Sequence, residues 1–129
     1  MANRRTVDPH ELRAAVNAVT PWLDGDAPEP ARAELARAVR LSLRALAQLA
    51  PGNSVEVRVP PFAVVQCVAG PRHTRGTPPN VVQTDAATWL RLATDRLRWA
   101  DAVGAGRVSA SGNRAAEVAV LLPLVRSVR

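Results

Sequence analysis

The stretch from Asp85 to Leu124 constrains the fold of this chain more than any other part of the sequence. It holds two of the three tryptophans, Trp89 and Trp99, and it ends in the longest apolar run of the chain. Between the tryptophans and this run, residues 107–112 show a weak alternation of apolar and polar side chains, which is typical of a strand. A run this apolar must be buried against another layer, so we expect its large apolar residues to belong to the core.

The spacing within this stretch predicts two short helices before that strand and one after it. Asp85 can cap the first helix, and residues 99–103 indicate a second helix that ends at Gly104. Asn113 can cap the last helix, and Pro123 stands where such a helix would end or kink. The large apolar residues predicted to belong to the core are Trp89, Leu92, Val103, Val118, Leu121 and Leu122.

Two further helices are predicted upstream. Asp8-Pro9 is a good helix start, and the apolar spacing from Ala31 to Leu49 is strongly helical. The second of these helices carries a stripe of arginines, Arg37, Arg40 and Arg44, which could bind an anionic surface. A solvated helix face is the favoured interpretation, because surface helices need a polar side in any case.

Three segments in the middle of the chain are predicted strands. Residues 55–59 alternate cleanly, with three valines on one side and Glu56 and Arg58 on the other. Residues 62–68 are mostly apolar and indicate a more buried second strand. Residues 80–84 indicate a third.

The loop between the second and third strands, residues 70–79, contains the best polar candidate site. It concentrates Arg72, His73 and Arg75 among two glycines and three prolines. One interpretation is a gate or polar rim that contacts the anionic head group of a ligand. The favoured alternative is a rigid turn whose arginines hold carboxylates or carbonyls in place.

Length and composition favour a single cytoplasmic domain. The chain has 129 residues, 47% of them hydrophobic, and it contains no apolar run long enough to span a membrane. Its basic N-terminus lacks the apolar segment of a secretory signal, and its single cysteine, Cys67, fits a reducing compartment. We divide the chain into an N-terminal helix with its connector (residues 1–30) and a main part (residues 31–129), which together form one compact domain.

The residue types argue against several classes of function. The net charge of +6 reflects 17 arginines that are scattered without a dense block, so specific nucleic-acid binding is not expected. His10, His73 and Cys67 lack a metal-binding spacing, and the sequence shows no nucleophile elbow or phosphate-binding glycine loop. Cys67 and His73 could pair across a turn, but a lone cysteine in an apolar strand is usually inert. We therefore expect no catalytic activity, metal or cofactor.

The order of these elements, together with one motif in residues 96–122, resembles the sterol carrier protein domain. Residues 55–59 and 62–84 look more specifically like the small bacterial SCP orthologue group of that family. The motif consists of Arg96-Leu97, residues 99–103, Gly106-Arg107-Val108-Ser109-Ala110-Ser111-Gly112 and Leu121-Leu122. It is similar to the family's short helix, its strand ending in glycine, and the helix that lies over the cavity. The resemblance extends over roughly residues 31–124.

The resemblance implies an α+β fold in which an antiparallel sheet of four to five strands is covered by helices. It implies non-catalytic binding of a lipid-like or other hydrophobic ligand, such as a fatty acyl chain, in a cavity between the sheet and the C-terminal helices. The alternative is a protein-interaction or accessory module with a filled cavity, whose partner the sequence does not identify. The residues assigned to the apolar lining are Trp89, Leu92, Trp99, Val103, Val118, Leu121 and Leu122, and those assigned to the polar rim are Arg72, His73 and Arg75.

Overall fold

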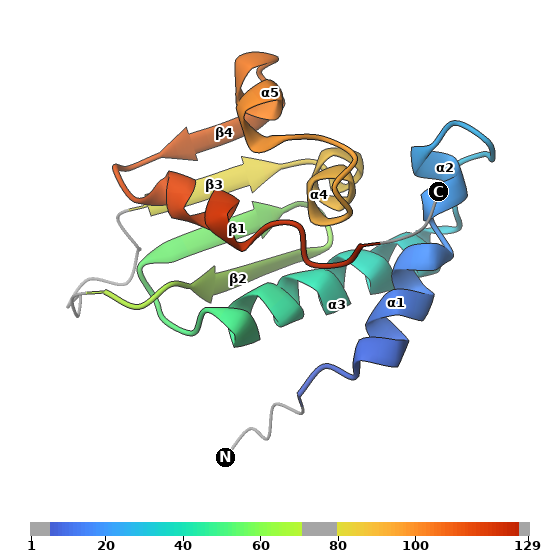
Figure 1. Ribbon diagram of the computed structural model, residues 1–129, viewed down its shortest axis with the longest axis horizontal. Coiled ribbons are helices and arrows are strands. Elements are labelled where there is room, and N and C mark those ends of the chain that lie inside the picture. Colours follow the sequence, from blue (N-terminus) through green and yellow to red (C-terminus); the bar gives the residue numbers. More distant parts are fainter. Residues whose placement is uncertain (1–5, 71–79, 127–129) are drawn as a thin grey trace.

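The computed structural model describes residues 6–70 and 80–126, and Figure 1 shows their arrangement. The helices are α1 (Pro9–Asn17), α2 (Thr20–Leu23), α3 (Arg32–Leu49), α4 (Ala86–Ala93) and α5 (Trp99–Gly104), followed by a 3-10 helix, η1 (Ala115–Leu121). The strands are β1 (Val55–Val59), β2 (Ala63–Cys67), β3 (Asn80–Thr84) and β4 (Val108–Ser111). The predicted α+β class is confirmed, and each of the four predicted strands is present.

The sheet is mixed, so the expectation of a purely antiparallel sheet is wrong. Its strands lie in the order β2-β1-β3-β4. The pairs β1–β2 and β3–β4 are antiparallel, whereas β1 and β3 run parallel with Val57 opposite Val82. The hairpin places β2 at one edge of β1, and the chain then returns to the start of β1 and adds β3 at its other edge. Alternation in a sequence identifies a strand but does not identify its neighbour.

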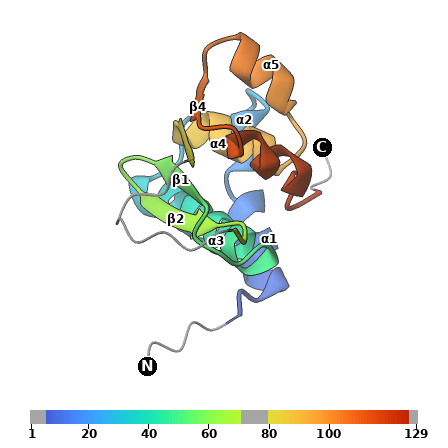
Figure 2. The ribbon, with the colours of Figure 1, turned by 90° about the vertical axis from the view of Figure 1, so that its left-hand side faces the viewer.

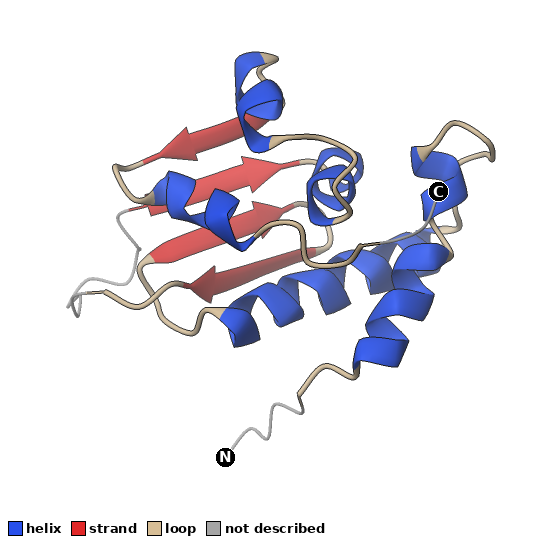
Figure 3. Ribbon diagram, in the orientation of Figure 1, coloured by secondary structure: helices blue, strands red, loops and turns tan. Residues whose placement is uncertain are grey.

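The described helices lie on one side of the sheet (Figure 2, Figure 3). The three valines of β1 are fully buried on that side, while Glu56 and Arg58 form an ion pair on the other. Val64 lies opposite Arg58 in the hairpin and shares its face, where it is 57% exposed. We call the face that carries the three buried valines the inner face. Its apolar residues must be covered by the helices.

The predicted start of α4 is confirmed, but the predicted start of the last helix is wrong. Asp85 caps α4 by accepting a 2.8 Å hydrogen bond from the backbone N–H of Thr88. The last helix is a 3-10 helix whose first flanking residue is Arg114, with no side-chain cap from Asn113. The N–H of Arg114 donates instead to Oδ1 of Asn80 at 3.0 Å. The backbone N–H at the start of η1 is thus bound by a residue of β3.

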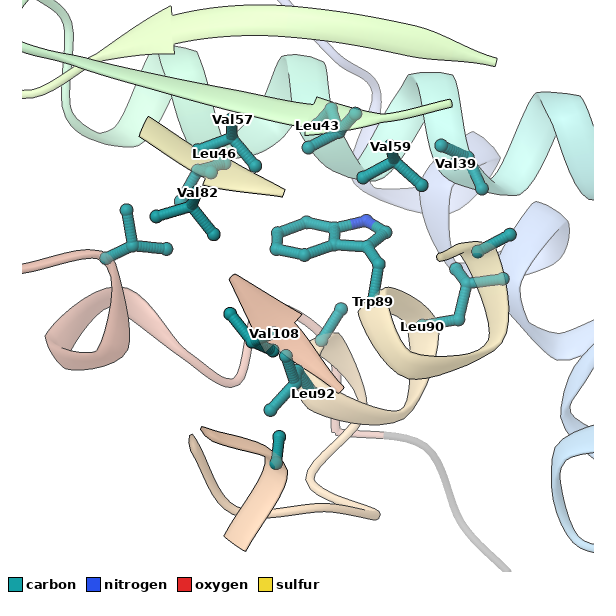
Figure 4. Packing of buried hydrophobic residues seen from close by; sticks show 14 of the residues in the cluster. Val39, Leu43, Leu46, Val57, Val59, Val82, Trp89, Leu90, Leu92 and Val108 are labelled. Carbon is teal, nitrogen blue, oxygen red and sulfur yellow. The ribbon is translucent and has the colours of Figure 1, made fainter. Parts of the chain in front are cut away.

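Trp89 occupies the centre of the core (Figure 4). Its side chain is 1% exposed, and its indole Nε1 donates a 2.8 Å hydrogen bond to Oγ of Ser42. The Ser42 hydroxyl in turn donates to the carbonyl of Ala38 at 2.7 Å. This chain of hydrogen bonds joins α4 to α3. The labelled apolar residues around the ring are Val39, Leu43, Leu46, Val57, Val59, Val82, Leu90, Leu92 and Val108.

Replacing Ser42 by alanine leaves the indole N–H of Trp89 buried without its acceptor. An unpaired buried donor costs about 1–3 kcal/mol, so we expect Ser42→Ala to lower the free energy of unfolding by about that amount. The matched control is Ser109→Ala, because Ser109 is exposed on β4 and its change is expected to stay within about 0.5 kcal/mol. Urea unfolding measures both variants, and equal stabilities would contradict this role of Ser42.

Candidate functional site

The candidate site is the apolar interior between the inner face of the sheet and the chain that follows β4. Its inner wall consists of Trp89 and Leu92 from α4 and Val118 from η1, which are 1%, 2% and 0% exposed. All three were predicted as lining residues from the sequence, and the fold brings them into one hydrophobic cluster. These three side chains would present an apolar surface to a ligand in this interior.

The front of the site is the cover segment, which we define as residues 119–124, directly after Val118. Leu121, Leu122 and Leu124 pack against the core cluster but remain half-buried, and Val120 is 82% exposed. The helical part of the segment is a 3-10 helix, whose hydrogen bonds have poorer geometry than those of an α-helix. The cover segment therefore depends strongly on its leucine contacts.

The far end of the cover segment is fixed to α4 and α1. The backbone N–H groups of Leu124 and Val125 both donate to the carbonyl of Ala93, at 2.9 and 3.0 Å. Val125 is buried and packs in a small second cluster with Leu12 and Val16 of α1. These contacts set the C-terminal limit of any part of the cover that could move.

Helix α5 directs only one of its two predicted lining residues toward the interior. Trp99 is half-buried and packs against the core cluster. Val103 is 41% exposed, so its predicted place in the core is wrong. The helix has six residues and buries Ala102 completely, which turns the next residue, Val103, away from the core.

Two apolar residues of β2 that the sequence did not single out also face this interior. Ala63 and Val65 are half-buried and pack against the core cluster. They lie directly opposite Val59 and Val57 in the hairpin, and residues in such pairs share a face of the sheet. Pairing residues 55–59 with the following apolar segment would have identified them.

A polar cluster closes the end of the sheet at which β1 and β3 begin. The side-chain amide of Asn80 donates to the carbonyl of Ser54 at 2.9 Å and accepts from the N–H of Arg114. The guanidinium of Arg114 donates to the carboxylate of Glu117 at 2.7 and 3.1 Å and to the carbonyl of Ala69 at 2.8 Å. The hydrogen bond between the two side chains raises the pKa of Arg114 and lowers the pKa of Glu117. Arg114 is thus held by groups of its own chain.

The other predicted polar residues belong to two groups, the polar rim and the arginine stripe of α3. The predicted polar rim, Arg72, His73 and Arg75, lies outside the described residues. In the arginine stripe of α3, Arg37 lies 3.8 Å from the carboxylate of Glu11, and Nε of Arg40 donates to the carbonyl of Phe62 at 3.2 Å. At least these two arginines of the stripe are engaged within the chain.

Cys67 is the candidate nucleophile of the sequence, and the structure places it inside the core. The residue is 0% exposed, and burial raises the pKa of its thiol to about 11. A thiol with this pKa stays protonated near neutral pH and is a poor nucleophile. Within residues 6–70 and 80–126, no group of three or more His, Cys, Asp or Glu side chains is placed to hold a metal ion.

The profile of one protein family matches the chain. The family is described as bacterial SCP ortholog, and the match covers residues 31–124. This range contains α3, the four strands, α4, α5 and the cover segment, and it leaves out α1 and α2. A comparison with curated proteins returns no match. In the part of the chain that the structure describes, no helix is both long and apolar enough to cross a membrane.

The burial of Cys67 predicts a slow reaction with alkylating reagents. Because the thiolate is the reacting species, we expect the folded protein at about pH 8.5 to react with iodoacetamide at least about tenfold more slowly than the urea-unfolded protein. Mass spectrometry of quenched samples measures the two rates. Similar rates would contradict the buried placement of this side chain.

The thiol of Cys67 also makes the free energy of unfolding depend on pH. Its pKa rises on folding from 9.0 to about 11, so the folded state keeps a proton that the unfolded state loses. The resulting stabilisation is complete below about pH 9 and is lost as the pH rises toward about 11. Urea midpoints measured across this range should fall more steeply for the natural chain than for Cys67→Ala. Equal slopes would rule out this contribution.

Proposed function

The chain belongs to the bacterial SCP ortholog family, and from this membership we propose that it binds a hydrophobic, lipid-like ligand without catalysing a reaction on it. The proposed place is the interior between the inner wall and the cover segment. A fatty acyl chain, or a ligand of similar apolar character, suits a site bounded by valine, leucine and tryptophan side chains.

The observation that carries this proposal is the half-burial of the leucines in the cover segment. Leu121, Leu122 and Leu124 pack against the core without being sealed into it, whereas Trp89 and Val118 of the same cluster are fully buried. Moving Leu121 and Leu122 outward would expose the apolar inner wall, while the hydrogen bonds from Leu124 and Val125 to Ala93 stay in place. An acyl chain that enters there replaces the leucine side chains with apolar groups of its own.

The energetics of such an exchange favour a flexible apolar ligand. Each methylene group that leaves water contributes about 0.8 kcal/mol, so burying a short run of methylenes offsets the cost of exposing one or two leucine side chains. The anchor at Val125 and Ala93 would hold the cover segment to the protein while its leucines give way. Binding then requires a local opening and leaves the sheet intact.

The non-catalytic part of the proposal is supported by the chemistry of the described residues. The thiol of Cys67 is buried with a raised pKa, which removes the nucleophile that the sequence had offered. Trp89, Leu92 and Val118 of the inner wall are apolar, and the Ser42 hydroxyl beside Trp89 is engaged with Trp89 and Ala38. These side chains can hold a ligand, but they do not supply an acid or base.

One observation favours a second candidate function, a protein-interaction module with a filled interior. The Trp89 ring occupies the middle of the core and is fixed there by its hydrogen bond to Ser42. If the interior stayed filled in solution, the family fold would serve as a surface for a partner protein. The two functions differ in whether purified protein takes up an acyl ligand.

A pair of neighbouring substitutions on η1 tests the proposed ligand site. Leu121→Asp places a charge under the cover and should weaken the binding of palmitate by delipidated protein about tenfold or more, since it removes apolar contact and adds a charge to desolvate. Val120→Asp is the matched control, because Val120 belongs to the same segment but its side chain is 82% exposed to solvent. Isothermal titration calorimetry measures both affinities.

Native mass spectrometry of the protein as purified provides the complementary readout. We expect a bound species of acyl-chain mass that organic extraction removes. Equal palmitate affinities in the two variants would contradict the proposed location. A natural chain that neither carries nor takes up any acyl ligand would favour the protein-interaction module.

A further inference from the structure

The ring of Trp89 lies across the interior in which the ligand is proposed to bind. Figure 4 shows the ring in the middle of the cluster, with Leu43, Val57 and Val59 on one side and Leu92 and Val108 on the other. All of these residues are at most 6% exposed. The part of the interior next to α3 is therefore separated by the indole from the part next to α4 and β4.

The indole is held in this position by a specific polar contact. Nε1 of Trp89 donates to Oγ of Ser42 at 2.8 Å, and Ser42 is 0% exposed. Turning the ring aside would leave the buried N–H and its acceptor unpaired, which is costly in an apolar surrounding. The ring would also leave a close-packed position between α3 and the sheet, so its displacement is opposed by packing as well.

We infer that Trp89 determines the depth of the ligand site and thereby the length of the acyl chain that the protein accepts. This inference rests on the proposed function. A chain that enters beneath Leu121 and Leu122 ends at the indole face and does not continue toward α3. The accepted ligands are then short apolar chains, or ligands whose longer tail stays outside the cover segment.

This barrier has a measurable signature in a series of ligands. Each methylene that becomes buried raises affinity about fourfold, so affinity for straight-chain fatty acids should climb with length until the chain reaches the indole. Beyond that length further methylenes remain in water, and affinity levels off. The length at which the plateau begins reports the depth of the site.

The experiment compares the natural chain with Trp89→Leu and with Trp22→Leu. Trp22 is a half-buried tryptophan of α2 that packs on the edge of the core, so its replacement controls for the general loss of a tryptophan. Affinities for the fatty-acid series are measured by isothermal titration calorimetry on delipidated protein. We expect the plateau of Trp89→Leu to begin at a longer chain, with a gain of about fourfold for each added methylene, and that of Trp22→Leu to stay unchanged.

Two results would overturn the inference. One is an unchanged plateau in a Trp89→Leu protein that still unfolds cooperatively; the other is the same shift in Trp22→Leu. If Trp89→Leu does not fold, Trp89→Phe shortens the ring system while keeping an aromatic residue, and its plateau decides the question in the same way.

The series also separates this inference from the proposed function. If Trp89→Leu binds fatty acids and the natural chain binds none, the indole does block the interior, but the natural protein is not a carrier of these ligands. If neither protein binds a fatty acid of any length, both the proposed function and the inference fail.

Discussion

The hydrogen bond from the Trp89 indole to Ser42 is the contact on which the rest of the interior depends. It joins α4 to α3 across a separation of 47 residues, and it fixes the largest side chain of the core against the buried valines of β1 and β3. A buried indole without an acceptor would be costly, so the ring and the hydroxyl position one another. The sheet, α3 and the inner wall are arranged around this one fixed ring.

Patterns that are local in the sequence predicted most of the elements. The alternation of residues 55–59 indicated β1, the apolar spacing from Ala31 indicated α3 to within one residue, and Asp85 caps α4 as expected. Contacts between distant residues could not be read in this way. The parallel pairing of β1 with β3 and the binding of the Arg114 N–H by Asn80 each depend on where the chain returns in space.

In the candidate site, too, the sequence predicted what depends on local pattern and missed what depends on distant contacts. The sequence identified Trp89, Leu92 and Val118 because large apolar residues in an apolar stretch are usually buried, and the structure gathers them into one wall. It misplaced Val103, since a six-residue helix has too few residues for its pattern to define the buried side. Ala63 and Val65 were missed because their orientation follows from pairing with β1. No pattern in the sequence indicated the hydrogen bond between Trp89 and Ser42.

Family membership and core packing constrain function in different ways. Membership in the bacterial SCP ortholog family supports the proposal of an apolar ligand. Under this proposal, the fixed ring of Trp89 and the half-buried leucines of the cover segment would confine the ligand to the space under the cover, on the α4 side of the indole. A carrier of this design would hold a short apolar chain while keeping α3 and the sheet closely packed.

On this proposal, a bound acyl chain lies inside the protein and ends at Trp89. The most direct test is the set of nuclear Overhauser effects between the terminal methyl group of a carbon-13-labelled fatty acid and the protein. We predict contacts from that methyl group to the Trp89 ring and to the methyl groups of Leu121, with none to Val64 on the open face of the sheet. A methyl group that contacts only surface residues such as Val64, or none at all, would contradict it.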